Sequence, residues 1–268
     1  MTLAFDRRGS GPPLVLIHGI GHRWQAWQPV LDQLAEHHDV YSIDLPGFGA
    51  SPVPAGGMPH GMPATVAALG ESLARLGLDR PHVAGNSLGG AISLELAAAG
   101  LAASATALSP AGFFTEAERR RALRILSRMR LGTFAPGPMM RPFLRSPRGR
   151  AVSFGPIVAW PDRLDHDRVV GDALAMRRGK GFRAVTRASE GYAYTGAPAC
   201  PVTVGWGERD HIFGVHQLDR VRERLPQARH ERLPGCGHVP MSDDPDAVAT
   251  LILTTTGAVT PPAPAGSR

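Results

Sequence analysis

The apolar residues of this chain gather in short continuous runs, separated by longer stretches with apolar positions at helical spacing. The first run covers 14–17, Leu-Val-Leu-Ile, and the second covers 40–43, Val-Tyr-Ser-Ile. Later runs begin at His82, Ala105 and Pro201. Short apolar runs of this kind are typical of strands that are buried on both faces of a sheet. A further strand is expected at about 229–233.

Helical patterns lie between these runs. Apolar residues recur at a spacing of three and four over 24–34, over 62–76 and from Ser87 to about Ala99. Pro245, preceded by Asp243 and Asp244 as candidate N-caps, indicates the start of the last helix. Regular alternation of strand and helix predicts an α/β fold, with a mostly parallel sheet and helices on both faces.

A long interruption follows the run that ends at Leu108. The next strand begins only after Cys200, whereas ordinary connections in such folds take about 2 to 6 residues. The interruption contains an arginine-rich amphipathic stretch over 116–131, a proline-rich stretch and a second helical pattern over 165–178. We interpret it as a mostly helical lid inserted before the last two strands.

The expected domain organisation follows from these boundaries. The residues from 257 on are rich in proline, alanine and threonine, which predicts a disordered tail. The predicted parts are a sheet core over 1–110 and 196–256, a helical lid over 111–195 and a tail over 257–268.

Charge is unevenly distributed along the chain, whose net charge is +6. The stretch 112–195 holds 16 arginines and 1 lysine against 7 acidic residues. This stretch is either a solvated helical face or a surface for an anionic substrate or an acidic partner. No nucleic-acid motif accompanies the arginines, so a nucleic-acid partner is not expected.

Targeting signals and cysteine pairing are not predicted. No apolar stretch reaches the 18 to 20 residues of a membrane span, and the first residues lack the pattern of a secretion signal, so the expected location is cytoplasmic. Cys200 opens one expected strand and Cys236 follows the far end of its neighbour. That separation exceeds the reach of a disulfide, which predicts two free thiols.

The segment Gly85-Asn86-Ser87-Leu88-Gly89 carries the most specific chemistry. It joins an apolar strand to a helix of small residues, and glycines two positions either side of Ser87 allow a sharp turn that exposes the serine hydroxyl. A serine becomes a nucleophile only when a base removes its proton and an acid orients that base. Asp210 and His238 follow the last two expected strands and are the candidates for these roles.

Other residues compete for the same roles. Glu208 stands two positions before Asp210 on the same loop, and His211 and His216 follow it. We favour Asp210 as the acid and His238 as the base, and expect the two other histidines to be solvated.

The chain resembles the α/β-hydrolase superfamily from Leu14 to about Leu253. Five segments carry the resemblance, and they occur in the family's order. They are His18-Gly19-Ile20-Gly21, Asp44-Leu45-Pro46-Gly47-Phe48-Gly49-Ala50-Ser51, Gly85-Asn86-Ser87-Leu88-Gly89-Gly90, Gly205-Trp206-Gly207-Glu208-Arg209-Asp210 and Gly237-His238.

The resemblance implies an oxyanion hole made by the backbone N–H groups of Ile20 and Leu88. We expect His18 to brace its loop rather than transfer protons, and Asp44 to fix the loop that follows it. Most relatives have two or more antiparallel strands before the first parallel strand. Here only residues 2–7 can form one.

The predicted function is a serine hydrolase that cleaves a carboxylic ester or related acyl compound through an acyl-enzyme. Its partner is a small-molecule acyl substrate, and neither a cofactor nor a metal is predicted. One alternative keeps Ser87, Asp210 and His238 but cleaves carbon–carbon bonds of ring-fission products, or acts as a cofactor-free haloperoxidase or perhydrolase. The other is a non-catalytic ligand receptor on the same fold.

Aromatic and methionine side chains leave a further question open. Trp24 and Trp27 are expected either in the core or in a pocket wall. The same two interpretations apply to several side chains of the predicted lid, which are Phe113, Phe114, Met139, Met140, Phe143 and Trp160.

Overall fold

The computed structural model describes residues 1–258 and contains one sheet of seven strands, in the order β1-β3-β2-β4-β5-β6-β7. Strand β1 pairs antiparallel with β3, and all other neighbours are parallel. This arrangement confirms the predicted α/β fold. The strands are β1 (Phe5–Arg8), β2 (Pro13–Ile17), β3 (Asp39–Ile43), β4 (His82–Asn86), β5 (Ser104–Leu108), β6 (Val202–Gly207) and β7 (Arg229–Leu233).

Burial along the strands explains why their sequences differ. All residues of β5 and β6 are buried, because helices cover both faces of the sheet there. Edge strand β1 alternates exposed and half-buried positions. It is the one strand before β2, as expected, and the Arg7 guanidinium binds the Asp39 carboxylate of β3 at 2.8 and 2.9 Å.

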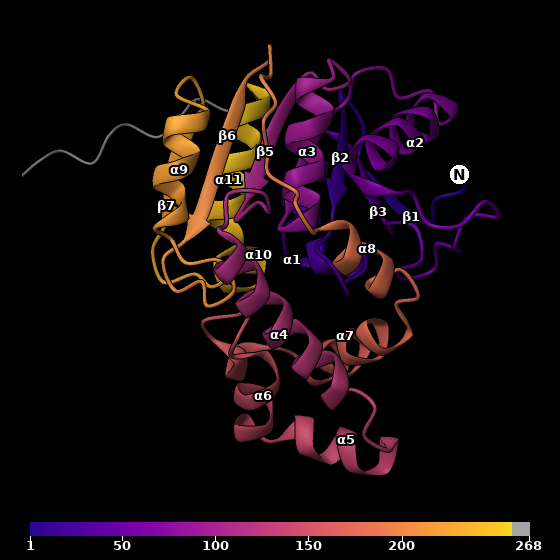
Figure 1. Ribbon diagram of the computed structural model, residues 1–268, viewed down its shortest axis with the longest axis vertical. Helices are drawn as coiled ribbons and strands as arrows, with labels where there is room; N and C mark the ends of the chain where they lie inside the picture. Colours follow the sequence, from indigo (N-terminus) through magenta and orange to yellow (C-terminus); the bar gives the residue numbers. More distant parts are fainter. Residues whose placement is uncertain (259–268) are drawn as a thin grey trace, which may run out of the picture.

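Two layers of helices sandwich the sheet, as Figure 1 shows for α3 in front of it and α11 behind it. Helix α3 packs on β4 and β5, and α2 packs on α3, whereas α1 and α11 pack on each other and on the opposite face. These core helices are α1 (Gln28–Ala35), α2 (Gly61–Arg75), α3 (Leu88–Ala98), α9 (Gln217–Arg224), α10 (Pro240–Asp243) and α11 (Pro245–Thr256), with the short 3-10 helix η1 (Trp24–Trp27) before α1.

The residues between β5 and β6 form a group of helices beyond one end of the sheet (Figure 1). We call residues 111–195 the inserted segment. Its first helix begins at a capping box, in which the Thr115 hydroxyl accepts from the N–H of Glu118 and the Glu118 carboxylate accepts from the N–H of Thr115. Its helices are α4 (Glu116–Gly132), α5 (Gly137–Arg145), α6 (Pro147–Phe154), η2 (Pro161–Arg163), α7 (His166–Arg178) and α8 (Phe182–Ala188).

Three further predictions concern the cysteines, the C-terminal tail and membrane-spanning helices. Cys200 and Cys236 are both free thiols, as expected. Gly257 ends α11 in the left-handed conformation, with φ 78°, and most of the predicted tail, residues 259–268, lies outside the described residues. Within residues 1–258, no helix has both the length and the apolar character needed to cross a membrane.

Candidate active site

Ser87 lies on the turn between β4 and α3 in a conformation that side chains rarely adopt, with φ 57° and ψ −112°. The two flanking glycines explain how the turn closes. A Cβ atom on Gly85 would lie 2.0 Å from the carbonyl oxygen of Gly89, and one on Gly89 would lie 2.0 Å from that of Ile17. Strand, turn and helix therefore approach at distances that only glycine allows, and the turn stores roughly 1–3 kcal/mol of backbone strain.

Asp210 and His238 meet at the carboxyl end of the sheet. The His238 ring nitrogen Nδ1 lies 2.8 Å from Oδ2 of Asp210, and both side chains are buried. The other carboxylate oxygen of Asp210 accepts hydrogen bonds of 2.8 Å from the N–H groups of Ile212 and Phe213. The carboxylate is thus fixed by its own loop and in turn fixes the imidazole tautomer.

The competing residues lie elsewhere. Glu208 and His211 are exposed, and the His216 ring lies against Glu118 of α4. Among the described residues, Asp210 is the carboxylate that binds His238. Of these candidates, Asp210 and His238 are therefore the two that the structure brings into contact.

The main chain of His238 also lies next to the turn that carries Ser87. The Asn86 side-chain amide donates to the carbonyl oxygens of His238, at 2.8 Å, and Leu108, at 3.2 Å. Asn86 immediately precedes Ser87. In the described structure no hydrogen bond joins the Ser87 hydroxyl to the His238 ring, a contact that in unliganded enzymes often tightens only when substrate binds.

Two backbone N–H groups are free beside Ser87. Among residues 1–258, neither Ile20 nor Leu88 uses its N–H in a hydrogen bond, although both line the same cavity as Ser87. A Cβ atom on Gly19 would lie 3.3 Å from Cβ of Ser87, so the loop that contains Ile20 lies directly against the serine. Free donors beside a nucleophile are the arrangement that an oxyanion hole requires.

His18 is a structural brace. Its Nδ1 lies 2.7 Å from the carbonyl oxygen of Gly19, and its Nε2 accepts a 3.0 Å hydrogen bond from the N–H of Leu45. Burial lowers the pKa of His18 to about 3, which keeps the ring neutral. Asp44 is equally structural, because its carboxylate accepts from the N–H groups of Trp24 at 2.7 Å and Ala50 at 2.8 Å.

Asp243 holds the loop of His238, a role that the sequence did not reveal. Only Asp244 caps α11, accepting from the N–H of Ala247, so the expectation that both acids form the cap is wrong for Asp243. The Asp243 carboxylate instead accepts from the N–H of Gly237 at 2.8 Å, of Ala159 at 2.9 Å and of Trp160 at 3.1 Å. Ala159 and Trp160 lie about eighty residues before Asp243 in the chain, and no local sequence pattern indicates such a contact.

The inserted segment contacts the His238 loop at two further points. The N–H of Val239 donates to the carbonyl oxygen of Ile157 at 2.9 Å, and the indole of Trp160 donates to that of Gly235 at 3.1 Å. The main-chain N–H groups on either side of His238 therefore donate to Asp243 and Ile157, and the carbonyl of His238 accepts from Asn86.

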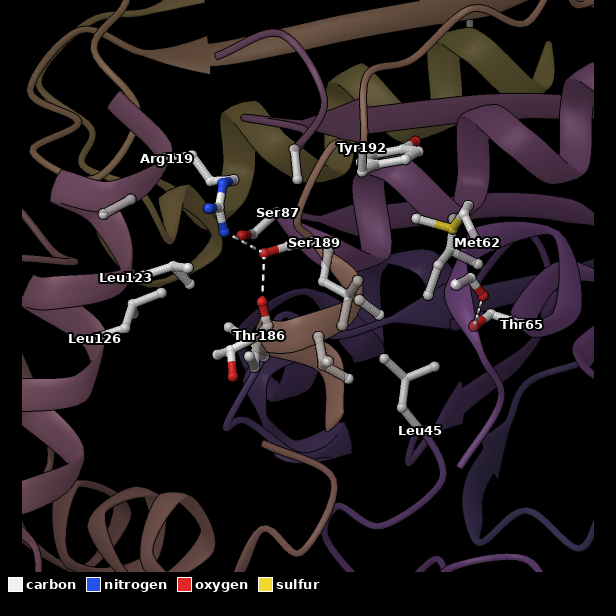
Figure 2. A pocket seen from close by; sticks show the side chains of 18 of the residues that line it. Leu45, Met62, Thr65, Ser87, Arg119, Leu123, Leu126, Thr186, Ser189 and Tyr192 are labelled. Carbon is white, nitrogen blue, oxygen red and sulfur yellow. Dashed lines mark hydrogen bonds between the residues drawn. The ribbon is translucent and has the colours of Figure 1, made fainter. Parts of the chain in front are cut away.

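The cavity at Ser87 is apolar and has a volume of about 110 Å³. Polar groups are few, and Figure 2 shows one set of them, in which Arg119 of α4 donates to the Ser189 hydroxyl at 3.2 Å and Ser189 donates to the Thr186 carbonyl at 2.7 Å. The Arg119 charge is also paired with Glu116. The apolar walls of the cavity come from the loops after β2, β3 and β6, from α2 and from the inserted segment, and include Leu45, Phe48, Met62, Phe114, Leu123, Leu126 and Phe213.

The aromatic and methionine side chains divide between core and cavities. Trp27 is fully buried in the core, and neither Trp24 nor Trp27 lines the Ser87 cavity. Phe113 is buried and Phe114 lines the Ser87 cavity. The Trp160 ring centre lies 4.6 Å from the guanidinium carbon of Arg163 and 4.8 Å from that of Arg209. The remaining three, Met139, Met140 and Phe143, line a second cavity.

The chain belongs to the Alpha/beta hydrolase family, whose profile matches residues 14–251. Among curated proteins, a pimeloyl-[acyl-carrier protein] methyl ester esterase of Aeromonas hydrophila is 38% identical over 97 residues, which are 36% of this chain and 36% of that protein. A 2-hydroxy-6-oxo-2,4-heptadienoate hydrolase of Pseudomonas putida is 41% identical over 92 residues, or 33% of each chain. These alignments thus span about a third of the relatives' length.

A solved structure matches over nearly the whole chain. The esterase RhEst1 from Rhodococcus superposes with a TM-score of 0.74 at 22% identity, covering 96% of this chain and 94% of that one. At this identity the likeness shows the fold. Family and relatives together support a hydrolase on this fold.

Proposed function

We propose that this protein is a serine hydrolase that cleaves an uncharged carboxylic ester, with Ser87 as nucleophile, His238 as general base and then acid, and Asp210 as the residue that orients His238. The hydrogen bond of 2.8 Å between Asp210 and His238, next to the strained Ser87 turn, is the observation that carries this proposal. The esterase names of the relatives support the same class.

The chemistry proceeds in two halves. His238 takes the Ser87 proton as the serine oxygen attacks the ester carbonyl, and the N–H groups of Ile20 and Leu88 hold the resulting oxyanion. Collapse of this intermediate expels the alcohol, which His238 protonates, and leaves an acyl group on Ser87. Water, deprotonated by His238, then attacks the acyl carbonyl and releases the acid and the free serine.

The cavity determines which esters fit. Its walls are almost entirely apolar, and its arginine is paired with Glu116, so the group that it holds is an apolar acyl or alcohol part. We propose that the inserted segment acts as a cap, because Phe114, Leu123 and Leu126 of this segment form part of the cavity wall.

A fluorophosphonate probe tests the assignment, since it labels an activated serine irrespective of the substrate. We expect the wild type to be labelled stoichiometrically and to hydrolyse short aryl esters, and Ser87→Ala to lose both properties. Undiminished labelling of Ser87→Ala would rule out Ser87 as the nucleophile.

A second candidate is hydrolysis of a carbon–carbon bond in a ring-fission product. The relative from Pseudomonas putida, named for a heptadienoate substrate, favours it. A vinylogous diketone acid assayed beside aryl esters separates the two reactions. Higher kcat/KM for the diketone, with Ser87→Ala inactive on both substrates, would establish the second candidate.

A further inference from the structure

A second cavity, of about 710 Å³, is lined mainly by the inserted segment. It is formed between α4, α5, α6 and α7 and by the loop after β2. Its size and apolar lining match those of cavities that hold organic ligands. The apolar side chains that line it include Ile125, Met129, Met140, Leu144, Phe154, Ile157 and Met176.

Helix α4 separates this cavity from the one at Ser87. Leu123 and Leu126 line the Ser87 cavity, whereas Ile125 and Met129 line the second. The two cavities share no lining residue. A ligand in the second cavity is therefore held apart from the nucleophile.

Exposed apolar side chains surround the second cavity. Met139 is 67% exposed, Val152 is 72% exposed and Phe143 is 49% exposed, and all three also line the cavity. Large apolar side chains that are exposed together around a hollow are typical of a binding surface. They indicate that an apolar group enters the cavity from this side.

The charge of the same region indicates an anionic ligand. Residues 119–161 contain 10 arginines and no aspartate or glutamate. The acidic residue on the cavity wall, Asp172, is already paired with two arginines outside this stretch. Arg128 lines the cavity, is exposed, and makes no ion pair within the described part of the chain. On the cavity wall the ring nitrogen Nδ1 of His22 is buried without a hydrogen-bond partner, as happens where a ligand supplies one.

We propose that this cavity binds a free long-chain fatty carboxylate, with the alkyl chain among its methionine and phenylalanine side chains and the carboxylate against Arg128. An alkyl chain matches the apolar lining and the exposed apolar mouth, and a single anionic end matches the unpaired arginine. The site is distinct from the proposed ester-cleaving centre, because Ser87 takes no part in it.

Binding of cis-parinaric acid, a fluorescent fatty acid, to the full chain tests the proposal. We expect one site per chain, present equally in Ser87→Ala, from which palmitate displaces the probe and hexadecanol does so about five-fold less well. Ser153→Phe fills the second cavity and should weaken binding about ten-fold. Ala188→Phe is its control, since it fills the Ser87 cavity and should leave binding unchanged.

Arg128 and Arg124 form a second matched pair on α4. Arg128→Gln should weaken palmitate binding about five-fold, whereas Arg124→Gln, exposed but outside the cavity, should not. Absence of saturable binding to the wild type would overturn the proposal. So would loss of binding in Ala188→Phe but not Ser153→Phe, or sedimentation with phosphatidylglycerol vesicles without binding of monomeric palmitate.

Discussion

The Asn86 side chain donates a hydrogen bond of 2.8 Å to the main-chain carbonyl of His238, which links the residue before the proposed nucleophile to the proposed base. The same amide donates to the carbonyl of Leu108 in the neighbouring strand β5. One side chain therefore sets the position of the His238 main chain relative to the turn that carries Ser87. Asn86 is thus a positioning residue, which acts through His238.

Replacing Asn86 should lower turnover more than substrate binding. Asn86→Ala leaves the buried carbonyl of His238 without its donor, which corresponds to about 1–3 kcal/mol and to roughly ten-fold or more in kcat, with KM within about two-fold. Steady-state ester hydrolysis and the rate of fluorophosphonate labelling measure the effect. Ser93→Ala is a control, because it removes a buried hydroxyl on α3 that bonds to Gly89 and does not touch His238. Equal losses in both variants would argue against a specific role for Asn86.

Replacement of the adjacent residues Asp243 and Asp244 should lower stability in both cases but lower kcat only for Asp243. Asp243→Ala frees the N–H groups of Gly237, Ala159 and Trp160, so we expect kcat to fall roughly ten-fold and stability to fall by about 2 kcal/mol. Asp244→Ala removes the N-cap of α11 and should cost about 1 kcal/mol of stability while kcat is kept. Urea denaturation and steady-state kinetics measure both quantities. An unchanged kcat in Asp243→Ala would show that the link between inserted segment and His238 loop does not serve catalysis.

Acid should destabilise the fold through buried neutral histidines. Burial lowers the pKa of His18 to about 3 from an ordinary value of 6.5, and it also lowers the pKa of His38 and His82, whose rings lie 5.5 Å apart. The unfolded chain therefore binds protons that the native chain does not, so stability is full above pH 6.5 and falls as the pH drops below it. At pH 5 the loss of unfolding free energy that is due to His18 alone is about 2 kcal/mol.

Urea denaturation at a series of pH values measures this loss. His18→Asn should reduce this pH dependence, because asparagine takes up no proton in this range. A free energy of unfolding that is constant between pH 7.5 and pH 5 would contradict the prediction.

Most strands of the sheet can be predicted from the sequence, because each depends on a short local pattern of residues. Continuous apolar runs mark β2 and β5 within a residue or so, and the polar strand Arg229–Leu233 was placed at its observed bounds. The turn at Ser87 can also be predicted from the sequence, since its geometry requires glycines at fixed positions around Ser87. Structural features that depend on neighbouring residues can therefore be predicted from a short stretch of sequence.

Contacts between distant segments were not readable in this way. Asp243 resembles a helix cap in sequence, and only the fold places it against Ala159 and Trp160 of the inserted segment. Similarly, nothing in the spacing of α4 shows that Leu126 and Ile125 line different cavities. Such features depend on how helices pack, which amphipathic periodicity constrains only to a face.

The backbone strain at Ser87 should be measurable as a difference in folding stability between two variants. Ser87→Gly and Ser87→Ala both remove the proposed nucleophile, but only glycine adopts φ 57° without steric cost. Allowing for the greater freedom of glycine in the unfolded chain, we expect Ser87→Gly to be about 1 kcal/mol more stable than Ser87→Ala, or roughly 2–4 °C in Tm. Calorimetry of the two inactive variants isolates the backbone term, because neither retains the hydroxyl. Equal melting temperatures would mean that the backbone conformation of Ser87 costs the fold no measurable stability.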